Sequence, residues 1–296
     1  MKINLLKFLL CLSSLAFITT SNAQMQPIEE VFEPAGTFSA EEFTKVAVLQ
    51  WAPNASAPIE DQVLADQFKA NNISILESYI REAAAKGAKY ISTPEFGIVG
   101  YPDIPELPPA EDNFRNREDI KPYVETVPGK SSNHFSNLAL ELGVYIQFGM
   151  AEKDSVTDLY YNTVVVIDPN GEVAAKYRKQ HLFQIEHDYL EEGTSNVTFQ
   201  TPFGKVGLVI CSDVYDYSVL EKYKLEQIDV LSLSTSWTEN NTGWGYFTTA
   251  ATKTSAYVLA ANHDYYPDSG VIYPDGTTQS HIRQSTGLAY GYLPNK

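Results

Sequence analysis

The sequence has very little cysteine: only Cys11 and Cys211 occur in 296 residues. Cys11 lies in an N-terminal segment that we expect to be removed, so the mature chain keeps a single thiol. One cysteine cannot form an internal disulfide, which excludes the disulfide-stapled class of exported proteins. Two interpretations of Cys211 stay open at this level, a small buried hydrophobic residue or a reactive thiol.

Positive charge is also scarce, with 21 Lys and Arg against 37 Asp and Glu and a net charge of −16. A chain this acidic should repel nucleic acid and anionic lipid. We therefore predict neither as a partner of the mature protein. The five histidines show no metal-ligand spacing, so we predict no metal site and no other cofactor.

Long apolar runs are absent except at the N-terminus, where Leu5–Ile18 follows the positive residue Lys2. This run is shorter than the roughly 20 residues that a membrane-spanning helix needs. Small residues at Ser21 and Ala23 suit signal-peptide cleavage. Residues 1–23 are thus predicted to be a signal peptide, with a membrane anchor as the alternative. The mature chain is expected in the periplasm or outside the cell.

Strand-like and helix-like segments alternate along the remaining chain. Strands are predicted over 45–51, 90–93, 144–150, 160–167, 172–178, 205–210, 230–234, 256–261, 270–273 and 280–290, and helices over 61–86, 131–142, 219–227 and 245–255. Residues 24–43 are expected to form an irregular arm, 97–128 a long surface loop, and 44–296 one domain. The pattern predicts a mixed α/β domain with helices outside the sheet or sheets.

Three polar residues lie where predicted strands end: Glu95, Lys179 and Cys211. Reactive groups gather at such places in α/β folds. A cysteine can attack an amide as the thiolate, a glutamate can shuttle the proton, and a lysine can hold charge at the oxyanion. Each residue alone is weak evidence, because a charged residue at a strand end is usually just solvated.

An ordered series of motifs surrounds these residues and resembles the nitrilase, or carbon–nitrogen hydrolase, superfamily. The series consists of VAVLQ at 46–50, TPE at 93–95, VPGKSSNHFSNLALELGVYIQFGMAEKD at 127–154, YYNTVVVIDPNGEVAAKYRKQHLF at 160–183, KVGLVICSD at 205–213 and NHDYYPDSGVIYPDG at 262–276. The resemblance implies a Glu95–Lys179–Cys211 triad, with the backbone N–H of Ser212 in the oxyanion hole and Glu186 in support. It also implies a four-layer α-β-β-α sandwich, often paired as a homodimer.

Within the superfamily the likeness is closest to the vanin and biotinidase branch. Cys211-Ser212-Asp213, TSWTEN at 235–240 and SGVIYPDG at 269–276 carry it, whereas that branch's paired cysteines are missing. The resemblance implies a small-molecule amide as substrate, of the pantetheine or biotinyl-amide kind. Trp237 and His263 are candidates for the substrate pocket, although ordinary core packing is the more frequent role of such aromatic side chains.

Three other functions stay open. A non-catalytic relative could bind its ligand without cutting it, but such a chain tends to lose one of the three catalytic residue types. An N-acyltransferase would pass the acyl group to an amine. A true nitrilase resembles Cys-Trp-Glu after the nucleophile, where this chain has Cys211-Ser212-Asp213.

Overall fold

The computed structural model describes residues 28–54, 58–102, 113–237, 243–265, 268–283 and 285–296. The predicted signal peptide, 1–23, lies outside these residues. None of the helices in this part of the chain is both long enough and apolar enough to cross a membrane.

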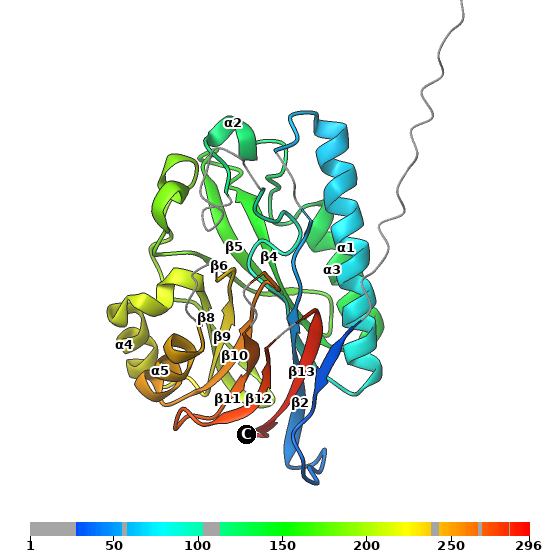
Figure 1. Ribbon diagram of the computed structural model, residues 1–296, viewed down its shortest axis with the longest axis vertical. Coiled ribbons are helices and arrows are strands. Elements are labelled where there is room, and N and C mark those ends of the chain that lie inside the picture. The colour runs from blue at the N-terminus through cyan, green and yellow to red at the C-terminus, as the bar shows by residue number, and fades with distance from the viewer. Residues whose placement is uncertain (1–27, 55–57, 103–112, 238–242, 266–267, 284) are drawn as a thin grey trace, which may run out of the picture.

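Two β-sheets form the centre of the molecule (Figure 1). The first has seven strands in the order β1-β13-β2-β3-β4-β5-β6. Its strands are β1 (Glu30–Phe32), β2 (Phe43–Gln50), β3 (Tyr90–Ser92), β4 (Tyr145–Lys153), β5 (Tyr160–Ile167), β6 (Val173–Arg178) and β13 (Gly287–Pro294).

The second sheet has six strands in the order β12-β11-β10-β9-β8-β7. Its strands are β7 (Thr198–Thr201), β8 (Gly204–Ile210), β9 (Val230–Ser234), β10 (Tyr257–Ala261), β11 (Ser269–Ile272) and β12 (Thr278–Ile282). The helices are α1 (Gln62–Ala85), α2 (Arg117–Ile120), α3 (Lys130–Leu142), α4 (Tyr217–Leu225) and α5 (Trp244–Thr254).

Three apolar cores separate four layers. The helices α1 and α3 cover the outer face of the seven-stranded sheet, and α4 and α5 cover the outer face of the six-stranded sheet (Figure 1). A third core lies between the sheets and includes Val46 and Val48 of β2 together with Leu208 of β8. The fold is therefore the α-β-β-α sandwich that the resemblance implied.

The alternation of side chains between two faces explains why a central strand such as β8 is apolar along its length. In β8, Val206, Leu208 and Ile210 belong to the core between the sheets, while Val209 points to the opposite face, toward α4 and α5. A strand that is apolar on both faces fits only between two covered layers. Helix ends follow local signals too: Asp61 accepts a hydrogen bond from the N–H of Leu64 at the start of α1, and Gly143 ends α3 with φ of 64°.

Two sequence-based expectations were wrong. Within the expected irregular arm, residues 30–32 form β1, which pairs in parallel with β13 at the sheet edge. The described parts of the expected surface loop 97–128 are largely interior, since Tyr101, Phe114 and Tyr123 are buried. Gly, Pro and acidic residues suggested exposure there, but the aromatic side chains pack into the core beneath α1 and α3.

Candidate active site

The ends of three strands meet in one place and carry the three residues singled out in the sequence. Glu95 follows β3, Lys179 follows β6 and Cys211 follows β8. Pairing is parallel from β3 to β4, then antiparallel to β5 and to β6, so β3 and β6 point the same way. Glu95 and Lys179 are each 1% exposed, and Cys211 is half-buried.

Lys179 lies between two buried carboxylates. Its Nζ is 2.9 Å from Oε1 of Glu95 and 2.6 Å from Oε2 of Glu186. Burial alone would lower the pKa of Lys179, but the charges of Glu186 and Glu95 outweigh that effect and raise the pKa well above its usual value. The amine is therefore a permanent cation at neutral pH, and Glu186 is its second carboxylate partner beside Glu95.

Tyr101 and Asn162 bridge the same two carboxylates. The Tyr101 hydroxyl is 3.0 Å from Oε1 of Glu95 and 3.0 Å from Oε1 of Glu186. The Asn162 amide donates to the same two atoms over 2.7 and 3.1 Å. These neutral donors lock the orientation of both carboxylates without adding charge.

A second group of polar residues binds the other carboxylate oxygen and the backbone carbonyl of Glu95. The N–H of Ser236 donates to Oε2 of Glu95 over 2.8 Å. The His263 ring lies 2.7 Å from the carbonyl oxygen of Glu95 through Nε2 and 3.0 Å from the Ser236 hydroxyl through Nδ1. Burial lowers the pKa of His263 to about 4, so the ring is neutral. Nε2 therefore donates to the carbonyl and Nδ1 accepts from the hydroxyl.

Cys211 begins a short 3₁₀ turn, Cys211–Tyr215, directly after β8. Its sulfur lies 4.0 Å from the carbonyl oxygen of Ser236, the residue whose N–H binds Glu95. Burial raises the pKa of the Cys211 thiol far above its usual range and the charge of Glu95 raises it further, while Lys179 and the Thr235 hydroxyl only partly oppose this. The resting group is thus a protonated thiol that needs a base before it can attack.

Each of the three loops that carry these groups contains one residue with a strained backbone, and these are three of the six such non-glycine residues in the described part of the chain. Phe96, Gln184 and Cys211 have φ of 47°, 41° and 41°, in the left-handed region that side-chain-bearing residues rarely adopt. Phe96 adjoins Glu95, and Gln184 lies between Lys179 and Glu186. Strained residues of this kind cluster at functional sites, where the surrounding structure holds them in place.

The remaining predicted site residues lie around this cluster. Ser212 is buried, and its hydroxyl donates to the carbonyl of His181. Trp237 is buried in an aromatic group with Tyr215 and Tyr246. His263 has both ring nitrogens bonded to protein groups, as described above. A pocket role for Trp237 and His263 stays a prediction.

Gly149 of β4 lies directly behind Glu95. A Cβ added there would be 2.6 Å from the N of Phe96 and 2.7 Å from the O of Pro94, closer than real Cβ atoms come. A Gly149→Ala substitution should therefore displace the backbone of Glu95, the base predicted from the sequence, and we expect it to lower kcat by roughly 10²-fold, the effect of a small misplacement of such a group. Steady-state kinetics on the purified variant measures this.

The matched control is Gly245→Ala in α5, where the added methyl group meets nothing within 4 Å. Alanine there should leave kcat unchanged, and the helix should be stabilised slightly. Full activity in the Gly149→Ala protein would mean that this contact does not position Glu95.

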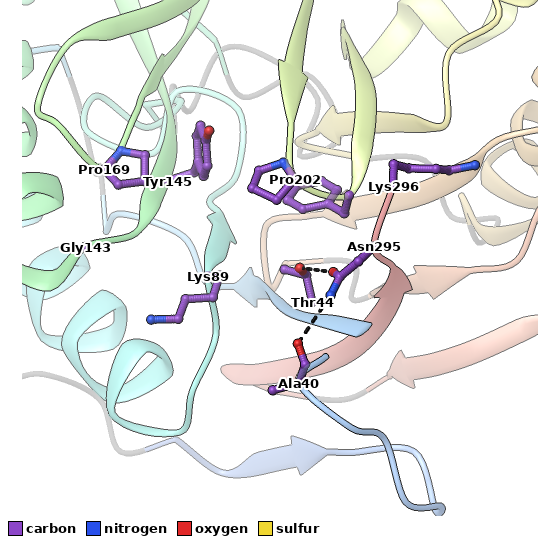
Figure 2. A pocket seen from close by; sticks show the side chains of 10 residues that line it. Ala40, Thr44, Lys89, Gly143, Tyr145, Pro169, Pro202, Asn295 and Lys296 are labelled. Carbon is purple, nitrogen blue, oxygen red and sulfur yellow. Dashed lines mark hydrogen bonds between the residues drawn. The ribbon is translucent and has the colours of Figure 1, made fainter. Parts of the chain in front are cut away.

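A separate cavity of about 480 Å³ opens where strands of both sheets begin, at the other end of the strands from the candidate site (Figure 2). Its lining includes Lys89, Tyr145 and Pro202, which precede or begin β3, β4 and β8. The two lysines that line it, Lys89 and Lys296, are exposed.

Across the part of the chain that the structure describes, no group of three or more His, Cys, Asp or Glu could hold a metal ion.

Residues 45–291 match the family described as carbon-nitrogen hydrolase. This match covers most of the chain. The chain belongs to the carbon–nitrogen hydrolase family. The predictions of family and of enzyme class are thereby confirmed.

Several carbon–nitrogen hydrolases resemble the chain in sequence. Omega-amidase NIT2 of Homo sapiens is 34% identical over 167 residues, which cover 52% of this chain and 53% of that protein. A nitrilase of Pyrococcus abyssi is 33% identical over 190 residues, covering 64% and 63%. A pantetheinase of Mus musculus is 31% identical over 186 residues, covering 56% of this chain and 36% of that protein. The chain thus spans from about a third to just under two thirds of these relatives.

Solved structures agree on the fold. Nit3 of Saccharomyces cerevisiae, a member of the nitrilase superfamily, matches with a TM-score of 0.70 at 21% identity, covering 88% of this chain and 93% of that one. An amidase from Nesterenkonia sp. matches with a TM-score of 0.69 at 18% identity and the same coverage. At these identities the likeness establishes the nitrilase-type sandwich.

Sequence reasoning missed several residues of the cluster. Tyr101 lies in the segment expected to be a surface loop, and Ser236 contributes through its backbone, which no side-chain pattern reveals. Asn162 did leave a signal: it is a polar residue within the otherwise apolar run of β5, YYNTVVVI. A buried amide inside a strand needs partners, and here they are Glu95 and Glu186.

Proposed function

We propose that this chain is an exported amidase that hydrolyses a small linear amide through a thioester on Cys211. The observation that carries the proposal is the buried pair of Glu95 and Lys179, connected through Ser236 to the neighbourhood of the Cys211 sulfur. A base, a fixed cation and a thiol are the three groups that thiol-based amide cleavage needs.

In the acylation half, Glu95 takes the proton of the Cys211 thiol as the sulfur attacks the amide carbonyl carbon. The resulting oxyanion is stabilised by the Lys179 ammonium and the backbone N–H of Ser212. When the tetrahedral intermediate collapses, the carbon–nitrogen bond breaks and Glu95 gives its proton to the departing amine. The high pKa of the thiol supports this order, because the sulfur has to lose its proton to the base during attack.

In the deacylation half, water attacks the thioester carbonyl and Glu95 accepts its proton. The carbon–sulfur bond then breaks, and the sulfur takes the proton back from Glu95. The balance is one amide and one water consumed, and one carboxylic acid and one amine released. Lys179 keeps its proton throughout, which its raised pKa supports.

The similarity to an omega-amidase and to a pantetheinase directs the choice of substrates. The test is a screen of the purified protein against ω-amides, pantetheine and biotinyl-lysine analogues, with products read by mass spectrometry. We expect one amide class to release its acid and amine in equal amounts. Hydrolysis of an added nitrile would identify a nitrilase. Transfer of the acyl group to an added amine would identify an acyltransferase. Binding of an amide without any product would favour the non-catalytic alternative.

Export through residues 1–23, pairing as a homodimer, and the lack of nucleic-acid or membrane partners stay predictions. Analytical ultracentrifugation of the purified chain tests the homodimer.

A further inference from the structure

Asp213 has no exposed surface and accepts four hydrogen bonds. Oδ1 accepts from the backbone N–H of Gln180 over 3.1 Å and of His181 over 2.8 Å. Oδ2 accepts from the backbone N–H of Ile210 over 2.8 Å and from the Tyr177 hydroxyl over 2.7 Å. Burial raises the pKa of Asp213 to about 6, so the group is a carboxylate at neutral pH and all four partners donate to it.

The four donors belong to the two strand-to-loop segments that carry the proposed cation and nucleophile. Gln180 and His181 directly follow Lys179, and Tyr177 lies two residues before it on β6 of the seven-stranded sheet. Ile210 directly precedes Cys211 at the end of β8, in the six-stranded sheet. One carboxylate therefore joins the ends of two strands from different sheets.

We propose that Asp213 is a positioning residue that fixes the Lys179 loop and the Cys211 loop relative to each other. The inference rests on the proposed function, in which the Lys179 ammonium must meet the oxyanion that forms beside the Cys211 sulfur. Asp213 also holds the 3₁₀ turn that gives Cys211 its left-handed backbone, because its own side chain binds the N–H at the start of that turn. The Ser212 hydroxyl, bonded to the carbonyl of His181, adds a second link between the loops.

A carboxylate is the group best suited to this position. Both of its oxygens accept, and each here receives two donors. An amide of the same shape has one acceptor oxygen and one NH₂ donor. Whichever way it turns, the NH₂ group faces at least one backbone N–H, which loses its partner and is repelled.

The test variant is Asp213→Asn. We expect kcat to fall by roughly 10-fold or more while KM stays within about twofold, because a group that acts only on transition-state geometry changes kcat. A Tyr177→Phe protein, which removes one donor of the four, should show a smaller loss of the same kind. A kcat of the Asp213→Asn protein within about twofold of wild type would overturn the inference.

The matched control is Asp216→Ala, three residues further along the same segment. Asp216 caps α4 by accepting from the N–H of Ser218 and makes none of the four contacts of Asp213. Its loss should lower the melting temperature but leave kcat unchanged. If both variants lose kcat in proportion to their loss of stability, Asp213 is only structural and the inference fails.

A second measurement does not depend on any amide being a substrate. The rate of iodoacetamide alkylation at Cys211, followed by peptide mass mapping, should fall several-fold in the Asp213→Asn protein at neutral pH. Removing a nearby negative charge would by itself favour the thiolate and speed alkylation. A slower reaction therefore isolates the loss of positioning beside Lys179, and an unchanged or faster one contradicts the inference. Failure of every amide in the screen would instead count against the proposed function alone.

Discussion

A Cys211→Ala protein should fold and bind its amide but show no measurable turnover, in an assay that would detect a kcat roughly 10⁴-fold below that of the wild type. Removing the sulfur takes away the atom that forms the thioester, and none of the groups bonded to Glu95 can replace it. The fold should be little affected, because Cys211 is half-buried and the hydrogen bond from its sulfur to the carbonyl of Ser236 is long at 4.0 Å. Alanine has the same backbone restrictions as cysteine at a φ of 41°. Steady-state kinetics and thermal melting on the same preparation measure both effects.

The chemical counterpart is alkylation of the wild-type protein. Iodoacetamide should add to Cys211 and abolish turnover in proportion to the fraction modified, and a bound amide should protect it. Peptide mapping separates this site from Cys11, which is the only other cysteine in the sequence. Measurable hydrolysis by the Cys211→Ala protein, or full activity after complete alkylation, would remove Cys211 from the mechanism.

Local sequence patterns predicted the strands and helices that are apolar in a regular way. The run KVGLVI alternates between two cores, and DPNG is a turn sequence between two predicted strands, so β8 and the β5–β6 hairpin follow from the sequence alone. The short strands β1 and β7 could not be found in this manner. β1 has three residues and no periodic signal, and it exists only because β13, at the far end of the chain, offers it an edge.

The residues of the site also fall into those with a local sequence signal and those without one. Glu95, Lys179 and Cys211 each end a recognisable strand, so their types and their places could be predicted together. Residues that act through tertiary contacts could not. Tyr101 reaches both carboxylates from a segment whose composition indicates a surface loop, and Gly149 matters only because the backbone of Glu95 packs against it. The four hydrogen bonds of Asp213 join segments that only the two-sheet packing brings together.

A Glu95→Gln protein should remain folded and lose kcat/KM by roughly 10³-fold, the scale of a lost general base. Glutamine keeps the length of the side chain and one oxygen for Lys179, Tyr101 and Asn162. Its NH₂ group then faces the N–H of Ser236, so one hydrogen bond is lost. Lys179 still has Glu186 as a partner, so its buried charge stays compensated. The loss of stability should be about 1–3 kcal/mol, the penalty of one unsatisfied buried group.

Glu186→Gln is the matched control. Both carboxylates bind Lys179, Tyr101 and Asn162. Only Glu95 binds Ser236, the residue whose carbonyl contacts the Cys211 sulfur. The two variants should therefore lose similar stability, while the loss of acylation should be much larger for Glu95→Gln. Rapid-quench measurement of the acyl-enzyme separates acylation from hydrolysis of the thioester. Should the Glu95→Gln protein unfold readily yet turn over normally when folded, Glu95 is a structural ion-pair partner. A dominant loss in Glu186→Gln would then make Glu186 the base, since it is the other carboxylate that contacts the cation.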